Sequence, residues 1–455
     1  MLQKAKIQAL RRNKHVYANQ KTIGFRARRA SALSLLAACG TTPSSTAQTG
    51  SSASGGAAAE PVTLTFWRAG TDVETETYWN AMIDRFEAEH PGVTVELSSL
   101  PWGDEIETKL NAAYASGTAP DILNYSLVSI PQRASVGQYA NLDSYVADWE
   151  GAQDIMPAVM ETGKYDGSVY GIPIKPDARM FVWRKDMFEA AGLDPETPPT
   201  TWEELKEFAD KLTIKENGTT VQAGYNMSIA NGFQDYQIFL MQNGGDFVDA
   251  ATNTLTYNSP EAVEALEFLN TFVQDGNVIP ADQFQSGSDV FVGGKAAMAY
   301  KNPADIQNMI TADPTLADKI GVSAPLSRKQ QATFGGMGFM FLSEDSKNKD
   351  LAWEFIEMAL NNDEMKIRID DLGIPPIRQS MVEDYVALDP EMNQAIVDAI
   401  AVGKGAYLVI YSNELNNQVS AAIEQVYYGK KSAQEALDES CLLYTSDAAD
   451  DLIGV

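Results

Sequence analysis

Val62-Thr63-Leu64-Thr65-Phe66-Trp67 is the first segment of this 455-residue chain that predicts a β-strand, because its alternating residues have strong strand preference. Apolar residues then recur at helical spacing from Trp79 to Phe86, and Pro91-Gly92 ends that helix. The next three elements are predicted as a strand, a helix and a strand over Val93–Leu100, Ile106–Ala115 and Asp121–Ser126. This β-α-β-α-β order predicts an α/β fold, in which helices cover a parallel sheet.

Later segments continue the pattern with recognisable helix starts. Thr200 and Thr201 precede Glu203 and Glu204, which gives a capping box in either register. Ser259-Pro260 has the residue types favoured at an N-cap and at the first helical position. Further strands are predicted over 169–174, 296–301, 321–325 and 337–342.

The N-terminus has the features of an export signal. Residues 1–38 contain nine Lys or Arg and no acidic residue, and the apolar run Ala30–Ala38 is only nine residues long. Such a run is too short to span a bilayer but suffices for the apolar part of a signal peptide. Leu36-Ala37-Ala38-Cys39-Gly40 resembles a bacterial lipobox, which implies that Cys39 becomes the lipidated first residue of the mature protein. The alternative is a basic, disordered N-terminus that contains a chance Cys.

A tether is predicted to follow. Residues 39–60 comprise this Cys and a linker, and residues 41–59 are uncharged and almost all small. Such a composition cannot bury a core and favours a flexible coil. We therefore expect an exported protein that is anchored to the outer face of the cytoplasmic membrane, at the cell surface or in the periplasm.

Charge and cysteine content exclude several classes of protein. The chain has 34 basic and 62 acidic residues, net −28; without the leader's nine basic residues the balance is 25 to 62, net −37. Such a surface repels nucleic acid and anionic lipid. Residues 61–440 contain no Cys, so no disulfide framework stabilises them. A segment of this length usually divides into two domains.

Six segments together resemble one family. They occur in the same order as in that family, and they are Phe86–Val95, Ala115–Ile122, Tyr165–Pro173, Trp183–Leu205, Gly294–Met298 and Gly429–Leu437. They resemble the helix-to-strand junctions, hinge approach, second-lobe start and C-terminal helix of extracellular solute-binding proteins of the sugar-binding, maltose-binding-protein-like group. The resemblance covers about residues 61–440.

The resemblance implies a two-lobed periplasmic-binding-protein fold of type II. Each lobe is then a mostly parallel sheet flanked by helices, with the ligand gripped in the cleft between the lobes. Lobe one is expected over 61–174 plus 301–341, and lobe two over 175–300 plus 342–440. The family delivers sugars to an ABC permease, is not enzymatic and needs no cofactor or metal; we expect a monomer.

Sugar chemistry and strand order select candidate ligand-binding residues. Sugars stack their C–H faces on aromatic rings, and their hydroxyls need fixed donors and acceptors. In open α/β sheets such side chains lie just beyond the C-terminal ends of strands. By this rule, and with two glycines included for close backbone approach, the candidates are Trp67, Arg68, Trp102, Asn124, Tyr125, Asp177, Arg179, Tyr300, Lys301, Asn302, Gly335 and Gly336.

Structural roles remain open for several candidates. Trp67 is equally suited to capping the core of lobe one, and Asp177 is suited to pairing with Arg179 across the hinge. Lys301-Asn302-Pro303 stands where the family often has an aromatic residue, which favours a different sugar or a more polar ligand.

Two other classes of function compete with sugar capture. A secreted polysaccharide hydrolase would use a pair of carboxylates, but only His15 and His90 are available for a hydrolase of the Ser-His-Asp type. No nucleophile elbow, zinc-protease motif, Walker loop or complete dinucleotide fingerprint occurs in the sequence. The second alternative is a binding protein for peptides, polyols or polyamines.

The C-terminal residues 441–455, Cys441 to Val455, do not continue the helical pattern of residues 433–439. They resemble a translated sequencing adapter, so we predict a non-native tail.

Overall fold

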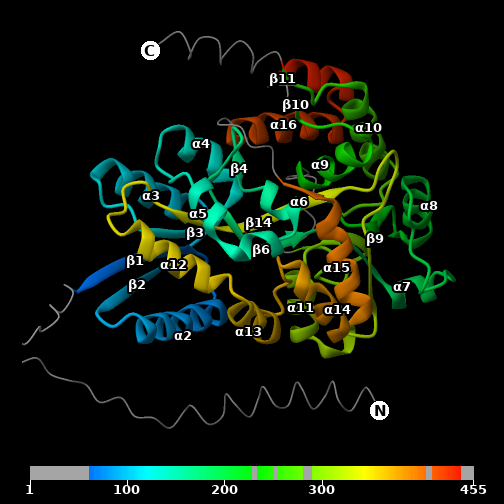
Figure 1. The fold of residues 1–455 in the computed structure, drawn as a ribbon. Coiled ribbons are helices and arrows are strands. Elements are labelled where there is room, and N and C mark those ends of the chain that lie inside the picture. Colours follow the sequence, from blue (N-terminus) through cyan, green and yellow to red (C-terminus); the bar gives the residue numbers. More distant parts are fainter. Residues whose placement is uncertain (1–60, 228–232, 250–253, 280–288, 406–411, 442–455) are drawn as a thin grey trace, which may run out of the picture. The chain divides into compact units, whose positions relative to one another are not determined.

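The computed structural model describes residues 61–227, 233–249, 254–279, 289–405 and 412–441. The described residues form a six-stranded sheet, a five-stranded sheet and the helices around them (Figure 1). The predicted signal peptide, lipidation site Cys39 and linker lie outside the described residues, as does the predicted tail except Cys441. We find no described helix whose length and apolar character would let it cross a bilayer.

The first sheet contains β1, β2 and β3, the three strands predicted at the start of the fold. Its order is β15-β14-β3-β1-β2, and β6 also pairs with β14. β1 is parallel to both β2 and β3, whereas β14 is antiparallel to β3 and β6. The strand bounds are β1 Val62–Ala69, β2 Val93–Leu100, β3 Ile122–Ser126, β6 Ile172–Ala178, β14 Thr333–Leu342 and β15 Gly403–Lys404.

The second sheet has the order β13-β7-β12-β9-β8. Its bounds are β7 Met180–Arg184, β8 Ile214–Glu216, β9 Thr219–Tyr225, β12 Ala296–Lys301 and β13 Ile320–Ser323. Two short two-stranded pairs lie outside both sheets: β4 Lys164–Tyr165 with β5 Ser168–Val169, and β10 Val248–Asp249 with β11 Thr254–Leu255. The first sheet passes directly into the second where β6 ends and β7 begins.

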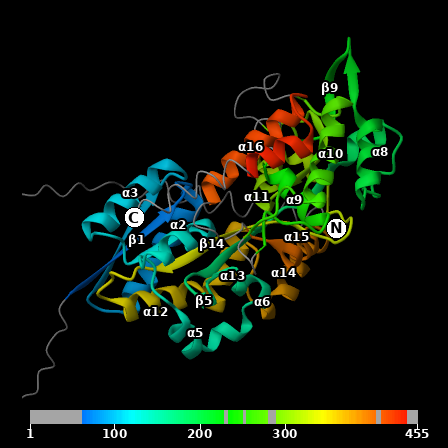
Figure 2. The ribbon, with the colours of Figure 1, turned by 90° about the horizontal axis from the view of Figure 1, so that it is seen from above.

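The helices of the first half are α2 Val73–Glu89, α3 Asp104–Ser116, α4 Ile130–Ser135, α5 Asp143–Asp148, α6 Pro157–Glu161, α7 Lys185–Ala190, α8 Trp202–Leu212 and α9 Phe233–Gln242. Those of the second half are α10 Pro260–Gln274, α11 Pro303–Ala312, α12 Lys349–Ala359, α13 Asn362–Leu372, α14 Val382–Leu388, α15 Pro390–Val402 and α16 Ser412–Tyr427, and residues 433–441 are also helical. α2 packs on β2 and α8 on β9, while α16 lies against α9 and α10 (Figure 2).

The strand pairing corrects two parts of the predicted organisation. The first sheet is mixed, with β1-β2, β1-β3 and β14-β15 parallel, but the second sheet is not mostly parallel: among its described strands, only β9 and β12 form a parallel pair. β13 pairs with β7 in the second sheet, although the sequence placed 301–341 in lobe one. Conversely, β15, at the edge of the first sheet, lies in the segment predicted for lobe two. In strand order, the chain passes from the first sheet to the second between β6 and β7 and returns between β13 and β14.

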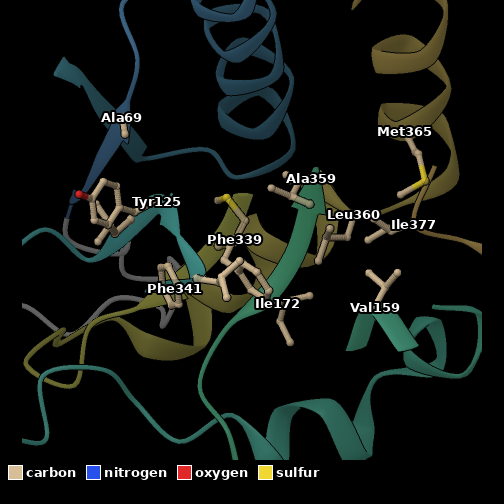
Figure 3. Close-up of a cluster of buried hydrophobic side chains, with 14 of the residues drawn as sticks. Ala69, Tyr125, Val159, Ile172, Phe339, Phe341, Ala359, Leu360, Met365 and Ile377 are labelled. Atoms are coloured by element: carbon tan, nitrogen blue, oxygen red, sulfur yellow. The ribbon is translucent and has the colours of Figure 1, made fainter. Parts of the chain in front are cut away.

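Helices α12 and α13 also belong with the first sheet rather than with the predicted second lobe, whereas α15 packs on both sheets, on β6 and β14 of the first and on β13 and β7 of the second. Phe355, Ile356 and Ile400 lie in the same buried cluster as the first sheet's Phe66 and Phe339. Figure 3 shows part of this cluster, where Phe339 and Phe341 of β14 lie near Ile172 of β6. The apolar face of α12 is buried against β14 and α2, and α13 packs on α2.

A second buried cluster packs against the second sheet. It joins Phe181 and Trp183 of β7 to Trp202 of α8 and to the apolar faces of α9, α10 and α16. Trp202 is fully buried, and Trp353 of α12 is buried in the first cluster. Both tryptophans therefore have core roles.

The predicted helix starts are present, and the structure selects one register of the capping box. Thr201 caps α8, because its hydroxyl accepts the Glu204 N–H and the Glu204 carboxylate accepts the Thr201 N–H. Ser259 caps α10, with Pro260 at its first position. These caps satisfy donors that a helix N-terminus otherwise leaves unpaired.

Candidate functional site

A cavity of about 450 Å³ lies where β6 passes into β7, against the end of β12 and the helices α9, α11 and α16. Polar and charged side chains make up most of its wall. It is lined by Arg179, Asn226, Phe233, Gln234, Asp235, Ile238, Asp289, Tyr300, Lys301, Asp305, Asn416, Asn417 and Ser420.

Arg179 is held at the junction of the two sheets by both its backbone and its side chain. Its N–H donates to the Phe334 carbonyl at 3.0 Å, and its carbonyl accepts the Thr333 hydroxyl at 2.8 Å. Its Nη1 donates to Asp177 Oδ1 at 2.9 Å, and its Nε donates to Gln234 Oε1 at 3.3 Å. The guanidinium carbon lies 5.3 Å from the centre of the Phe334 ring. These contacts fix the guanidinium at the cavity wall before any ligand arrives.

Lys301 ends β12 and contributes the second cation of the cavity. Its side chain is almost fully buried, and its Nζ forms an ion pair with Asp289 Oδ2. The Asn226 amide also donates to Asp289, at 3.4 Å. Because the buried ammonium has this carboxylate as its partner, the cost of desolvating it is offset.

Asp305 lies in the first turn of α11 and faces the same cavity. Asn302 caps this helix, since its Oδ1 accepts the Asp305 N–H at 2.7 Å. Burial raises the pKa of the Asp305 carboxyl, Lys301 and Arg179 act to lower it, and the other carboxylates nearby raise it further. Asn302, which we predicted as a ligand contact, thus has a structural role in holding α11.

Amide and hydroxyl groups fill the remaining wall. Asn416, Asn417 and Ser420 come from α16, and Gln234 comes from α9. Asp235 accepts the Tyr225 hydroxyl at 3.1 Å. Amides offer both donors and acceptors, so such a wall suits a ligand that carries several hydroxyl groups.

Tyr300 lines the cavity, and its hydroxyl is already hydrogen-bonded within the protein. The hydroxyl accepts hydrogen bonds from Gln242 Nε2 at 2.8 Å and from the Leu326 N–H at 3.1 Å. Burial raises the pKa of Tyr300 well above its ordinary value, which keeps the group neutral. Its available contribution to a ligand is the aromatic surface.

At the C-terminal edge of the first sheet, Trp102 forms an exposed aromatic surface. Its side chain is 58% exposed, and its ring stacks on Tyr125 with centroids 5.4 Å apart and an interplanar angle of 22°. Burial raises the pKa of Tyr125, and the nearby Glu107 raises it further. The supported indole is therefore a preformed stacking surface.

Arg68 lies beside this surface but is buried. Its side chain is 1% exposed, and its Nη2 donates to Asp72 Oδ2 at 2.7 Å. Gly70 allows the two groups to approach, because a Cβ there would lie 3.2 Å from both Arg68 Nη2 and Trp102 Nε1. In the described arrangement, Arg68 orders the loop that follows β1.

Four further candidates belong to the framework of the first sheet. Asn124 Nδ2 donates to the Phe339 carbonyl at 3.0 Å, and Trp67 is partly buried against the first cluster. A Cβ at Gly335 would lie 3.2 Å from the Gly403 carbonyl carbon, so this glycine permits close pairing of β14 with β15. Gly336 lies next to Asp177, at the same end of the strand.

The cavity thus contains Arg179, Tyr300 and Lys301 of the predicted set, with Asp177 beside it. Sequence analysis missed the polar residues Asn226, Asp289, Asp305, Asn416 and Asn417. Asn226 follows β9 directly, so the strand-end rule would have found it had that strand been predicted. Residues on α11 and α16 enter the cavity from helices, and no strand-end signal marks them.

The chain belongs to the family described as bacterial extracellular solute-binding protein, whose sequence pattern matches residues 81–395. With the two sheets and the polar cavity at their junction, this defines a two-lobed binding protein of ABC transport systems.

Named relatives cover most of the chain. A provisionally named binding protein of Brucella abortus (strain 2308) is 26% identical over 81% of this chain and 89% of its own length. A provisionally named amino-acid ABC transporter periplasmic-binding protein of Sinorhizobium fredii is 25% identical, covering 78% and 84%. The galactooligosaccharide-binding protein of Bacillus subtilis (strain 168) is 23% identical, covering 89% and 92%.

Two solved structures have the same fold and a sequence identity to the chain of 26%. A solute-binding protein of Thermotoga lettingae bound to α-D-tagatose is 26% identical, with a TM-score of 0.71 over 83% of this chain and 97% of that chain. A cyclic α-maltosyl-1,6-maltose-binding protein of Arthrobacter globiformis is 26% identical, with a TM-score of 0.72 over 84% and 97%.

Proposed function

We propose that this protein captures a sugar or oligosaccharide outside the cytoplasm and delivers it to an ABC permease. The observation that carries the proposal is the cavity beside Arg179, where amides, carboxylates and two cations surround the ring of Tyr300. Hydroxyl groups need such donors and acceptors, and a pyranose face needs an aromatic ring. The sugars bound by the Thermotoga and Arthrobacter proteins agree with this ligand class.

In this proposal, ligand contacts come from both sheets. Trp102, supported by Tyr125, offers the stacking surface from the first sheet, and Arg179 and Lys301 offer the polar wall from the other side. A ligand that touches both surfaces favours a closed state through contacts that an open state lacks. Small-angle scattering of the purified protein with and without a tightly bound sugar tests this, and identical profiles would refute closure.

The ligand class is tested by calorimetry and thermal unfolding against a panel. The panel contains mono- and oligosaccharides, polyols, amino acids, short peptides and polyamines. A ligand present at 100 times its dissociation constant stabilises the fold by about 2.7 kcal/mol, which gives a visible shift. Binding of a sugar supports the proposal. If only amino acids or peptides bind, the protein captures a different class of solute.

Binding without turnover is part of the proposal. The relatives are binding proteins, and we assign no catalytic residue. A bound oligosaccharide is therefore expected to be recovered intact by mass spectrometry after prolonged incubation. Its hydrolysis would instead support the alternative of a secreted hydrolase.

We also propose that the mature protein is a monomer tethered through lipid on Cys39 and the 41–59 linker. In cells, Cys39→Ser is expected to move the protein from the membrane fraction to the soluble fraction and to abolish incorporation of a fatty-acid label. Retention of the label in this variant would disprove lipidation at Cys39.

A further inference from the structure

The charged groups around the cavity do not balance. Asp305 interacts electrostatically with Lys301 and Arg179, and also with Asp289 and Asp177. With Asp235, which also lines the cavity, the group contains four carboxylates and two cations. A ligand that enters this wall therefore meets an excess of negative charge.

Both cations already have carboxylate partners of their own. Arg179 donates to Asp177 at 2.9 Å, with side chains that are 15% and 32% exposed, respectively. Lys301 pairs with Asp289, with side chains that are 9% and 35% exposed. Partly buried, hydrogen-bonded pairs of this kind are screened less than surface pairs, so a ligand anion would have to compete with them.

Asp177 and Asp289 pair with the two cations and Asp235 accepts the Tyr225 hydroxyl, which leaves Asp305. Within the described residues, its side chain accepts no hydrogen bond and forms no ion pair, although it lines the cavity. Its N–H is the group that the Asn302 cap engages. A partly buried carboxylate without a donor is costly, so it favours a ligand that brings one.

We propose that the ligand carries a primary ammonium group that binds Asp305, and that it is an amino sugar. This inference rests on the proposed function and specifies the ligand of the same cavity. The side-chain amides of Asn226, Asn416 and Asn417, which line the same cavity, suit the hydroxyl groups of such a sugar, whereas a polyamine carries no hydroxyl groups. The acidic surface of the chain, net −28, raises the local concentration of a cationic ligand as well.

The test uses calorimetry on matched pairs of ligands. Glucosamine is compared with glucose, fully deacetylated chitobiose with cellobiose, and spermidine serves as a cation without sugar hydroxyls. Hydrogen bonds to charged groups are stronger than neutral ones, so the amino sugar is expected to bind about tenfold tighter or more. This ratio is expected to fall as ionic strength rises.

Asp305→Asn replaces the carboxylate by a neutral group of the same shape and is expected to bring the ratio of amino to neutral sugar close to one. Asp363→Asn is the matched control, since Asp363 is an exposed carboxylate in the first turn of α13, outside the cavity. It is expected to keep the wild-type ratio. Unchanged far-ultraviolet circular dichroism and thermal unfolding of both variants exclude a folding defect.

Each other outcome overturns a defined part of the inference. Equal binding of amino and neutral sugars, or a wild-type ratio in Asp305→Asn, overturns the ammonium site while sugar capture stands. Tighter binding of spermidine than of either amino sugar overturns the sugar part. If no saccharide binds and another compound of the panel does, both this inference and the proposed function are overturned.

Discussion

Asp177 and Arg179, two residues apart in sequence, form a 2.9 Å ion pair where the chain passes from the first sheet to the second. The pair is anchored on both sides, because Gly336 pairs with Asp177 and the Phe334 carbonyl accepts the Arg179 N–H. The guanidinium is thus presented to the cavity from the junction between the sheets. Arg179 therefore lines the cavity from a position that is hydrogen-bonded to both β6 and β14.

Arg179→Ala is expected to weaken ligand binding about tenfold or more, because it removes a positioned charged donor from the cavity wall. Arg184→Ala is the matched control, since Arg184, at the end of β7, forms a similar pair with Asp186 of α7 but lies outside the cavity lining. Calorimetry with the best ligand of the panel measures both. Equal affinities for the two variants would remove Arg179 from the binding site.

Trp102→Ala is expected to weaken sugar binding several-fold, because aromatic stacking contributes about 0.5–1.5 kcal/mol beyond the area it buries. Trp102→Phe is expected to retain part of that affinity. Tyr428→Ala removes another exposed aromatic ring, 61% exposed beyond the end of α16, and is expected to have no effect. If Trp102→Ala binds as the wild type does, stacking occurs elsewhere.

Phe355→Ala is expected to destabilise the fold by about 3–5 kcal/mol, because it opens a cavity in the first buried cluster. Phe355 is fully buried and packs against Phe66 and Phe86, with ring centroids 5.3 and 5.2 Å away. Urea unfolding followed by circular dichroism measures the loss. Val73→Ala, at a 72% exposed position, is expected to change stability by no more than about 0.5 kcal/mol. A similar small change for Phe355→Ala would contradict the assigned packing.

Asp143 is expected to make stability depend on pH in the acidic range. The hydrogen bond from the Val169 N–H is the main cause that lowers the pKa of its carboxyl, and hydrogen bonds from Ser168 and Asn141 add to it. A carboxyl whose pKa is lower in the folded state stabilises the fold above its unfolded pKa, about 3.9, and this contribution disappears as pH falls through the folded value.

Asp143→Asn is therefore expected to lose less stability than the wild type between pH 5 and pH 2, as urea unfolding at stepped pH would show. Asp148→Asn changes an exposed residue at the other end of α5 and is the control. A wild-type acid profile in Asp143→Asn would count against this assignment.

Prediction from sequence succeeded where the signal was local. The alternation over Val62–Trp67 and the helical spacing after it identified β1 and α2, and β12 was predicted with its observed bounds. The Thr201 cap was recognisable because a capping box lies within four residues. Prediction failed for β7, whose neighbours β12 and β13 come from distant parts of the chain, and for β9, which pairs with distant β12 as well as with adjacent β8.

The candidate site shows the same division. The strand-end rule found Lys301 and Tyr300, because the end of a strand is a local feature. It also selected Asn124 and Gly335, whose partners Phe339 and Gly403 are far away in sequence. Asp289, Asp305 and Asn416 were missed, because they enter the cavity from a loop and two helices.

By itself, the sequence determined the α/β class of the fold, its opening strands and helices, the capped helix starts and, through local motifs, the resemblance to a solute-binding family. These follow from propensity, periodicity and short-range hydrogen bonds, which act between near neighbours. Only the tertiary structure decided that β13 joins the second sheet, that α12 and α13 pack with the first, and that the Asp305 carboxylate accepts no hydrogen bond from the described residues although it lies beside two ion pairs. Those outcomes depend on which distant strands pair and on how burial distributes charge, and both are properties of the packed chain.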